Sequence, residues 1–95
     1  MILEIEVTDA DTYGQYVQQA PATVAQYGGR YLVRGGAITT LSGGWDPQRM
    51  VVIEFPTMER FQKWLMSPEY SAIAPLRERS TKGKTIVVEG FQTEP

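Results

Sequence analysis

The stretch RYLVRGGAITTLSGGWDPQRMVVIEF, residues 30–55, contains the segments that decide the fold. Residues 30–34 read as a short strand, and residues 49–55 form a nearly continuous apolar run that suits a central strand. Glycine-rich turn sequences separate the two. The β-branched segment at 37–41 predicts either a hairpin return or a bent continuation of the first strand.

Strand patterns also stand near the two ends of the chain. Residues 3–7 (LEIEV) alternate apolar and acidic side chains, as a half-buried strand does. Residues 84–90 (KTIVVEG) read as a last strand. The residues after Phe91 predict a loose tail at 92–95.

Helical patterns fill the two intervals between these strands. After a cap at Thr8 or Asp9, aromatic and aliphatic residues recur every three or four positions, and Pro21 should kink or split this helix. A second helix begins after Thr57, restarts at the SPEY sequence of 67–70, and should be bent or shortened by Pro75.

The predicted order is therefore β-α-β-(β)-β-α-β, with the segment at 37–41 as the optional strand. This is the split βαβ, ferredoxin-like α+β arrangement: an antiparallel sheet with both helices on one face. At 95 residues the chain has room for one core, so residues 1–91 are predicted to form a single domain.

Alternation along the strands sorts their residues into two faces. One face is purely apolar and should meet the helices: Leu3, Ile5, Val7, Val51, Ile53, Phe55, Ile86 and Val88. The other mixes apolar residues with glutamates: Ile2, Glu4, Glu6, Met50, Val52, Glu54, Val87 and Glu89. If Tyr31 and Val33 face the helices, Arg34 joins this mixed face and can neutralise Glu54 or Glu4. A mixed face of this kind suits a homodimer that packs sheet against sheet.

Composition excludes several classes of function. The net charge of −2 and the pI near 5.0 argue against nucleic acid as a partner. No apolar run is long enough for a membrane span, which predicts a cytoplasmic protein with no membrane partner. Without cysteine or histidine there is no disulfide, no thiolate nucleophile and no familiar zinc site, so no metal or other cofactor is expected.

Several motifs resemble one known family along nearly the whole chain. YGGRYLVRGG (27–36), RMVVIEFP (49–56) and SPEY (67–70), with Arg77 downstream, closely resemble the domain-of-unknown-function 1330 family. The resemblance implies a dimeric α+β barrel, in which two ferredoxin-like domains pack sheet against sheet. It implies no activity, because the role of that family is unassigned. Pro75 departs from the pattern, since a helix former is expected there.

Five residues are candidates for a site. Arg34 and Arg49 flank the glycine-rich segment and could grip a carboxylate or phosphate together. The competing interpretation, the commoner situation in proteins, is that each arginine pairs with a sheet glutamate. Glu54 is the candidate general base, with the same ion pair as its alternative. Trp45 and Tyr70 could line a pocket between sheet and helices, although Trp45 could equally cover a partner subunit.

The sequence thus predicts a homodimer that binds a small, partly apolar, anionic metabolite in a pocket between sheet and helices. Two alternatives stay open. One is a cofactor-independent enzyme of the monooxygenase or isomerase type, with Glu54 or a tyrosine as base. The other is a purely structural or interaction dimer without a ligand.

Overall fold

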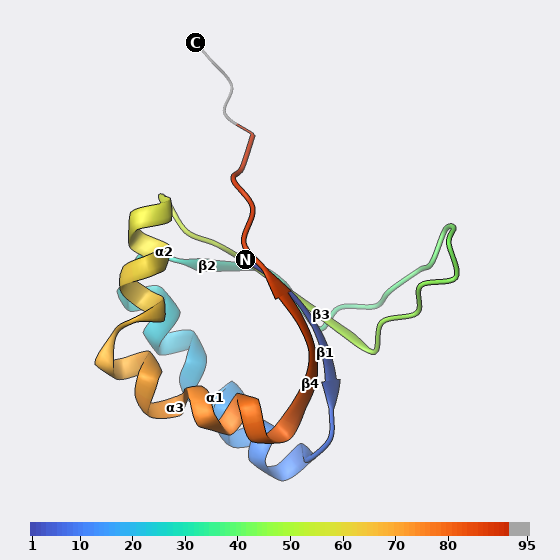
Figure 1. The fold of residues 1–95 in the computed structure, drawn as a ribbon, viewed down its shortest axis with the longest axis horizontal. Helices are drawn as coiled ribbons and strands as arrows, with labels where there is room; N and C mark the ends of the chain where they lie inside the picture. The colour runs from blue at the N-terminus through green and yellow to red at the C-terminus, as the bar shows by residue number, and fades with distance from the viewer. Residues whose placement is uncertain (92–95) are drawn as a thin grey trace.

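Four strands form one antiparallel sheet in the order β2-β3-β1-β4 (Figure 1). The computed structural model describes residues 1–91, so the loose tail expected at 92–95 lies outside the described part. In chain order the elements are β1 (Ile2–Val7), α1 (Ala10–Gln26), β2 (Arg30–Arg34), β3 (Arg49–Glu54), α2 (Met58–Leu65), α3 (Pro68–Ser80) and β4 (Thr81–Ile86). The ferredoxin-like α+β fold is confirmed.

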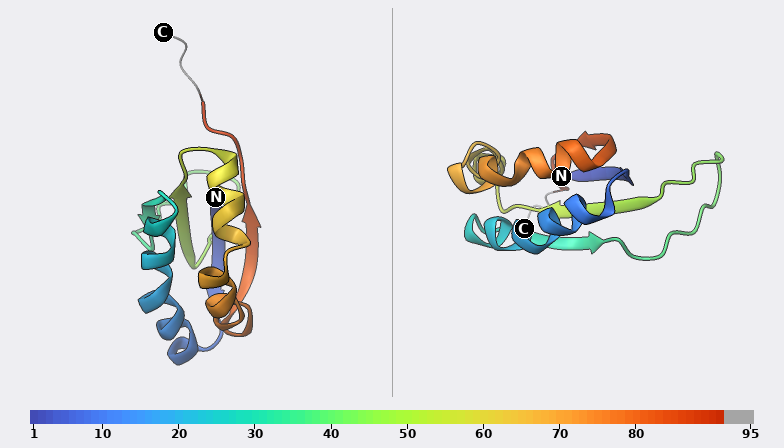
Figure 2. Two further views of the ribbon diagram at one scale, coloured as in Figure 1. Left: turned by 90° about the vertical axis from the view of Figure 1, so that its left-hand side faces the viewer. Right: turned by 90° about the horizontal axis from the view of Figure 1, so that it is seen from below.

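The helices cover one face of the sheet, and α1 packs beside α3 (Figure 2). Asp9 caps α1 by accepting a hydrogen bond from the backbone N–H of Thr12. Pro21 lies inside α1 without dividing it, so the predicted split does not occur. Pro75 likewise lies inside a continuous α3. Ser67 caps α3, and Pro68 occupies its first turn, as the SPEY sequence predicts.

The core lies between the sheet and the helices. Its buried apolar residues are Leu3, Ile5, Tyr13, Tyr16, Ala20, Val24, Val51, Ile53, Phe61, Trp64, Tyr70 and Ile73. Trp64 is 0 % exposed, and its indole N–H donates to the Thr23 hydroxyl at 3.0 Å. Trp64 is thus a core residue.

The last strand begins earlier than predicted. Helix α3 runs directly into β4 at Thr81, and Leu3 pairs with Thr85. Ile86 therefore does not face the helices as predicted: it is 59 % exposed, and Val88 beyond the strand is 61 % exposed. Gly83 permits this pairing, because a Cβ there would overlap the carbonyl oxygen of Glu4.

A β-bulge in β2 changes which face Arg34 occupies. The pairing of β2 with β3 shifts between Tyr31 and Val33, so Leu32 is the extra residue. Beyond the shift, Arg34 pairs with Val51, whose side chain is buried in the core. The prediction that Arg34 shares the outer face with Glu54 is therefore wrong, because an extra residue reverses the alternation of the strand.

Residues 35–48 form an irregular arm that extends away from the rest of the fold (Figure 1). The predicted strand at 37–41 is not formed. The indole N–H of Trp45 donates to the Glu4 carboxylate at 2.9 Å, and Gln48 accepts a hydrogen bond from the backbone N–H of Val7 at 2.8 Å. These two contacts attach the returning part of the arm to β1.

Within residues 1–91, none of the helices has the length and apolar character that a membrane crossing needs.

Candidate functional site

Arg34 and Arg49 line the same cavity on the helix side of the sheet. The Arg34 Nη2 donates to the carbonyl oxygen of Val17 at 3.1 Å, and the Arg49 Nε donates to the Tyr13 hydroxyl at 3.0 Å. Tyr13 and Val17 are four residues apart on α1, which places them one turn apart on the same side of the helix. The two arginines therefore reach from neighbouring strands to adjacent turns of one helix.

Gly35 makes room for this arrangement. Its φ of +74° lies in the left-handed region, which favours glycine. A Cβ at this position would overlap the guanidinium of Arg49. The backbone N–H of Gly35 also donates to the carbonyl of Met50 at 2.9 Å, which keeps the turn against β3. The first glycine of the VRGG sequence thus lets Arg49 lie beside Arg34.

Tyrosine rings support both guanidinium groups. The Arg34 guanidinium carbon lies 5.4 Å from the centre of the Tyr31 ring, and that of Arg49 lies 5.5 Å from the Tyr13 ring. These are cation–π distances. Burial raises the pKa of Tyr31 above its ordinary value, so its hydroxyl is protonated at neutral pH. The sequence analysis did not assign Tyr13 and Tyr31 to the site. The recurrence of aromatic and aliphatic residues every three or four positions along α1 is the signal that places Tyr13 on its buried side.

The cavity is small, with a volume of about 20 Å³. Its polar lining consists of arginine and tyrosine side chains, and the rest is aliphatic. A volume of this size holds about one water-sized group. No aspartate or glutamate of residues 1–91 lines the cavity.

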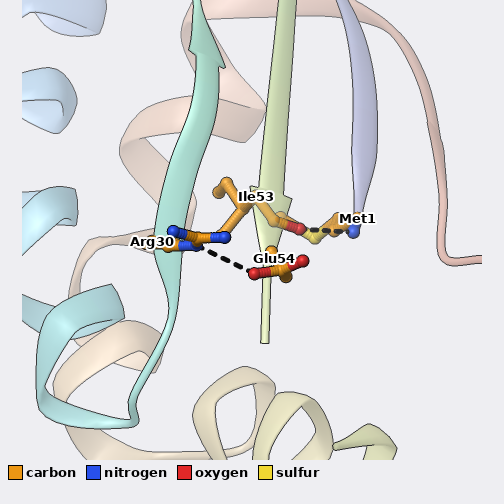
Figure 3. Close-up of polar contacts among 4 residues, drawn as sticks. All are labelled: Met1, Arg30, Ile53 and Glu54. Carbon is orange, nitrogen blue, oxygen red and sulfur yellow. Dashed lines mark hydrogen bonds and ion pairs between the residues drawn. The ribbon is translucent and has the colours of Figure 1, made fainter. Parts of the chain in front are cut away.

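Neither cavity arginine has a carboxylate partner in residues 1–91. The ion pairs in that part of the chain are Arg30–Glu54 and Lys63–Glu59. Figure 3 shows the first of them, where the Arg30 Nε donates to Glu54 at 2.8 Å across β2 and β3. Beside it, the amine of Met1 donates to the carbonyl of Ile53 at 2.7 Å. Glu54, one of the two glutamates predicted to pair with Arg34, thus forms its ion pair with Arg30. The other, Glu4, accepts a hydrogen bond from Trp45.

The other sequence candidates lie apart from this cavity. Glu54 is exposed and is held by Arg30, and it does not line the cavity. Trp45 lies on the arm and is bonded to Glu4. Tyr70 is buried in the core, where its hydroxyl is 3.0 Å from that of Tyr16. Tyr16 does line the cavity, so Tyr70 is connected to the cavity only through its hydrogen bond with Tyr16.

Arg77 is a third arginine near these tyrosines. Burial acts to lower the pKa of Arg77, but the neighbouring hydroxyls of Tyr70 and Tyr16 outweigh it and the pKa is raised. Its Nε is buried and has no hydrogen-bond partner among the described residues. Arg77 is not among the residues that line the cavity. Its Nη1 donates to the Thr85 hydroxyl of β4 at 3.4 Å.

A second, much larger hollow of about 950 Å³ lies at the end of the sheet that carries Met1 and Phe55. It is lined by residues of β1, β2 and β3, by the start of α2, and by the extended segment 87–91. Leu32 and Val88, which line it, are exposed apolar residues. Such a surface is typical of an interface between protein subunits.

Comparison with known proteins identifies one family. The model of the family described as "Domain of unknown function (DUF1330)" matches residues 1–91. No curated protein matches the sequence. Since the family model spans nearly the whole chain, this protein belongs to the domain-of-unknown-function 1330 family.

Proposed function

We propose that the protein is a homodimeric binding protein for a small, partly apolar anion, which Arg34 and Arg49 hold on the helix side of the sheet. One observation carries the proposal: two guanidinium groups line one cavity, and no carboxylate of residues 1–91 pairs with either. Arginine forks match the geometry of carboxylates and phosphates. The aliphatic remainder of the lining supports a ligand with an apolar part.

Electrostatics favours an anion at this point. Two like charges repel each other, and withdrawing them from water has a cost that an opposite charge offsets. Arg49 is half-buried, and Arg34 is held beside it by its bond to α1. In the nearby Arg30–Glu54 pair, the chain supplies the carboxylate itself. At Arg34 and Arg49, a bound anion would take that role.

The homodimer is supported by the outer face of the sheet. The helices cover only the opposite face, which leaves Leu32, Ile86 and Val88 exposed. The exposed arm adds Ile38, Leu41 and Trp45. A domain of this size can cover such surface by pairing with a second copy. The hollow at the end of the sheet would then lie in the interface.

The geometry favours binding over catalysis. The carboxylate expected to act as a base, Glu54, is exposed and paired with Arg30. The cavity itself offers arginine and tyrosine side chains, which donate hydrogen bonds. Such a lining can hold an anion but lacks a base that is active near neutral pH.

A thermal-shift screen tests the proposal. The purified protein is heated with small carboxylates, phosphates and aromatic metabolites, beside the double variant Arg34→Gln/Arg49→Gln. A ligand present at 100 times its dissociation constant should add about 2.7 kcal/mol to the free energy of unfolding. We expect at least one anion to raise the melting temperature of the natural protein but not that of the variant. If every anion acts equally on both proteins, the proposal is wrong.

A further inference from the structure

The cavity lining combines hydrogen-bond donors with apolar groups. Arg34, Arg49, Tyr13 and Tyr31 provide donors. The remaining contacts are largely aliphatic: Leu3, Ile5, Val17, Ala20, Val51 and Ile53. Arg34 is exposed, whereas Ala20 and Leu3 are fully buried. The charged end of a ligand therefore belongs at the solvent side, and its apolar end belongs inside.

Three donors can meet at the charged end. The arginines contact adjacent turns of α1, at the Tyr13 hydroxyl and the Val17 carbonyl, and both line the same cavity of about 20 Å³. One small anion can therefore lie between the two guanidinium groups. The Tyr13 hydroxyl accepts its hydrogen bond from Arg49, and its own proton has no acceptor within residues 1–91. Tyr13 can thus donate a third hydrogen bond to the anion.

The volume of the cavity limits the apolar end. About 20 Å³ accommodates one group of the size of a water molecule, and a methyl group is of similar size. A benzene ring or a long alkyl chain would have to displace core residues such as Val51 and Ile53, which are buried and closely packed. Only a short tail fits the cavity as it stands.

We infer that the ligand is a short aliphatic carboxylic acid of about two or three carbons, bound as its carboxylate between Arg34, Arg49 and Tyr13 with its methyl end in the cavity. This inference rests on the proposed function and narrows its ligand to one chemical class. A planar carboxylate presents two oxygens to two guanidinium forks. A tetrahedral phosphonate is bulkier than a planar carboxylate and needs more space between the guanidinium groups than so small a cavity provides.

Calorimetric or NMR titration with a ligand series tests the inference. The probes are acetate, propionate, butyrate, benzoate and methylphosphonate, each at constant ionic strength. We expect saturable binding of acetate or propionate, and binding of benzoate and methylphosphonate that is weaker by about 10-fold or more. Tyr13→Phe should weaken propionate binding about 10-fold, because it removes one hydrogen bond to a charged group.

A variant of the cavity wall supplies a second test that does not depend on absolute affinity. Val51→Ala enlarges the cavity, so the ratio of butyrate affinity to propionate affinity should rise relative to the natural protein. An unchanged ratio would show that the tail does not enter the cavity and would overturn the inference.

The outcomes separate the inference from the proposed function. If benzoate or methylphosphonate binds more tightly than propionate and needs Arg34 and Arg49, the short-acid inference fails while the anion site stands. If none of the anions binds in a manner that depends on these arginines, both are wrong.

Discussion

Two carboxylates stabilise the helices by accepting hydrogen bonds. Asp9 accepts from the Thr12 hydroxyl at 2.7 Å and from the Thr12 backbone N–H at 3.2 Å. Glu69 in the first turn of α3 accepts from its own backbone N–H and from the Tyr27 hydroxyl, which joins it to the end of α1. These hydrogen bonds lower the pKa of both carboxyl groups below their ordinary values.

Acid should therefore destabilise the fold through these two residues. A depressed pKa in the folded state stabilises the protein above the ordinary pKa of about 4, and the contribution is lost as pH falls through the lower folded value. We expect the urea midpoint to fall between pH 5 and pH 3. The double variant Asp9→Asn/Glu69→Gln keeps hydrogen-bond acceptors but does not titrate, so its midpoint should fall less. An equal fall in both proteins would contradict this role.

At the level of the elements, regular alternation made most of the sheet predictable. Strands β1 and β3 pair without a shift, so parity correctly places Leu3, Ile5, Val51 and Ile53 in the core. Alternation fails at Leu32, because a bulge depends on how two strands meet and has no clear signature in RYLVR.

The candidate site, like the sheet, could be predicted only in part from the sequence. The positions of Arg34 and Arg49 around the VRGG turn identified them as a pair, and the structure brings them to one cavity. Their surroundings could not be predicted, because the bulge decides the face of Arg34 and the packing of α1 brings Tyr13 to Arg49. Glu54 was assigned to the site from its place in an apolar strand, but its outward side chain meets Arg30.

The turn after β2 offers a matched pair of glycine variants. In Gly35→Ala, the new methyl group meets the Arg49 guanidinium and the positive φ is strained, which should cost roughly 1–3 kcal/mol of stability. Displacement of Arg49 should also weaken anion binding. At Gly36 a Cβ meets no atom within 4 Å, so Gly36→Ala should change both quantities little. Urea unfolding and a ligand titration measure the two effects, and equal behaviour of the two variants would argue against the role of Gly35.

At the scale of the whole molecule, its two sides differ in how they are covered. Helices pack on one face of the sheet, and the other face exposes apolar residues next to the extended segment 87–91 (Figure 2). The arm at 35–48 adds Leu41 and Trp45 to the exposed apolar surface. One side therefore carries the cavity lined by Arg34 and Arg49, and the other carries the exposed apolar surface that the proposed homodimer would bury.

Charge on the outer face should separate the subunits. Leu32→Asp places a carboxylate on the exposed apolar surface, where burial against a partner would be costly. Size-exclusion chromatography with light scattering should give a dimer for the natural protein and a monomer for this variant. Met66→Asp is the control, since Met66 is exposed at the end of α2 on the helix side. A monomeric natural protein, or a variant that stays dimeric, would contradict the predicted interface.

A calorimetric comparison of three arginine variants tests the proposed anion site most directly. The ligand is the anion that stabilises the protein most in the thermal-shift screen, titrated into Arg34→Gln, Arg49→Gln and Arg30→Gln. Arg30 lies on the same strand as Arg34 but is paired with Glu54. We expect the first two variants to lose at least about 10-fold in affinity, while Arg30→Gln should bind as the natural protein does. Equal losses in Arg30→Gln and Arg34→Gln, or full affinity in Arg34→Gln, would contradict the proposed anion site.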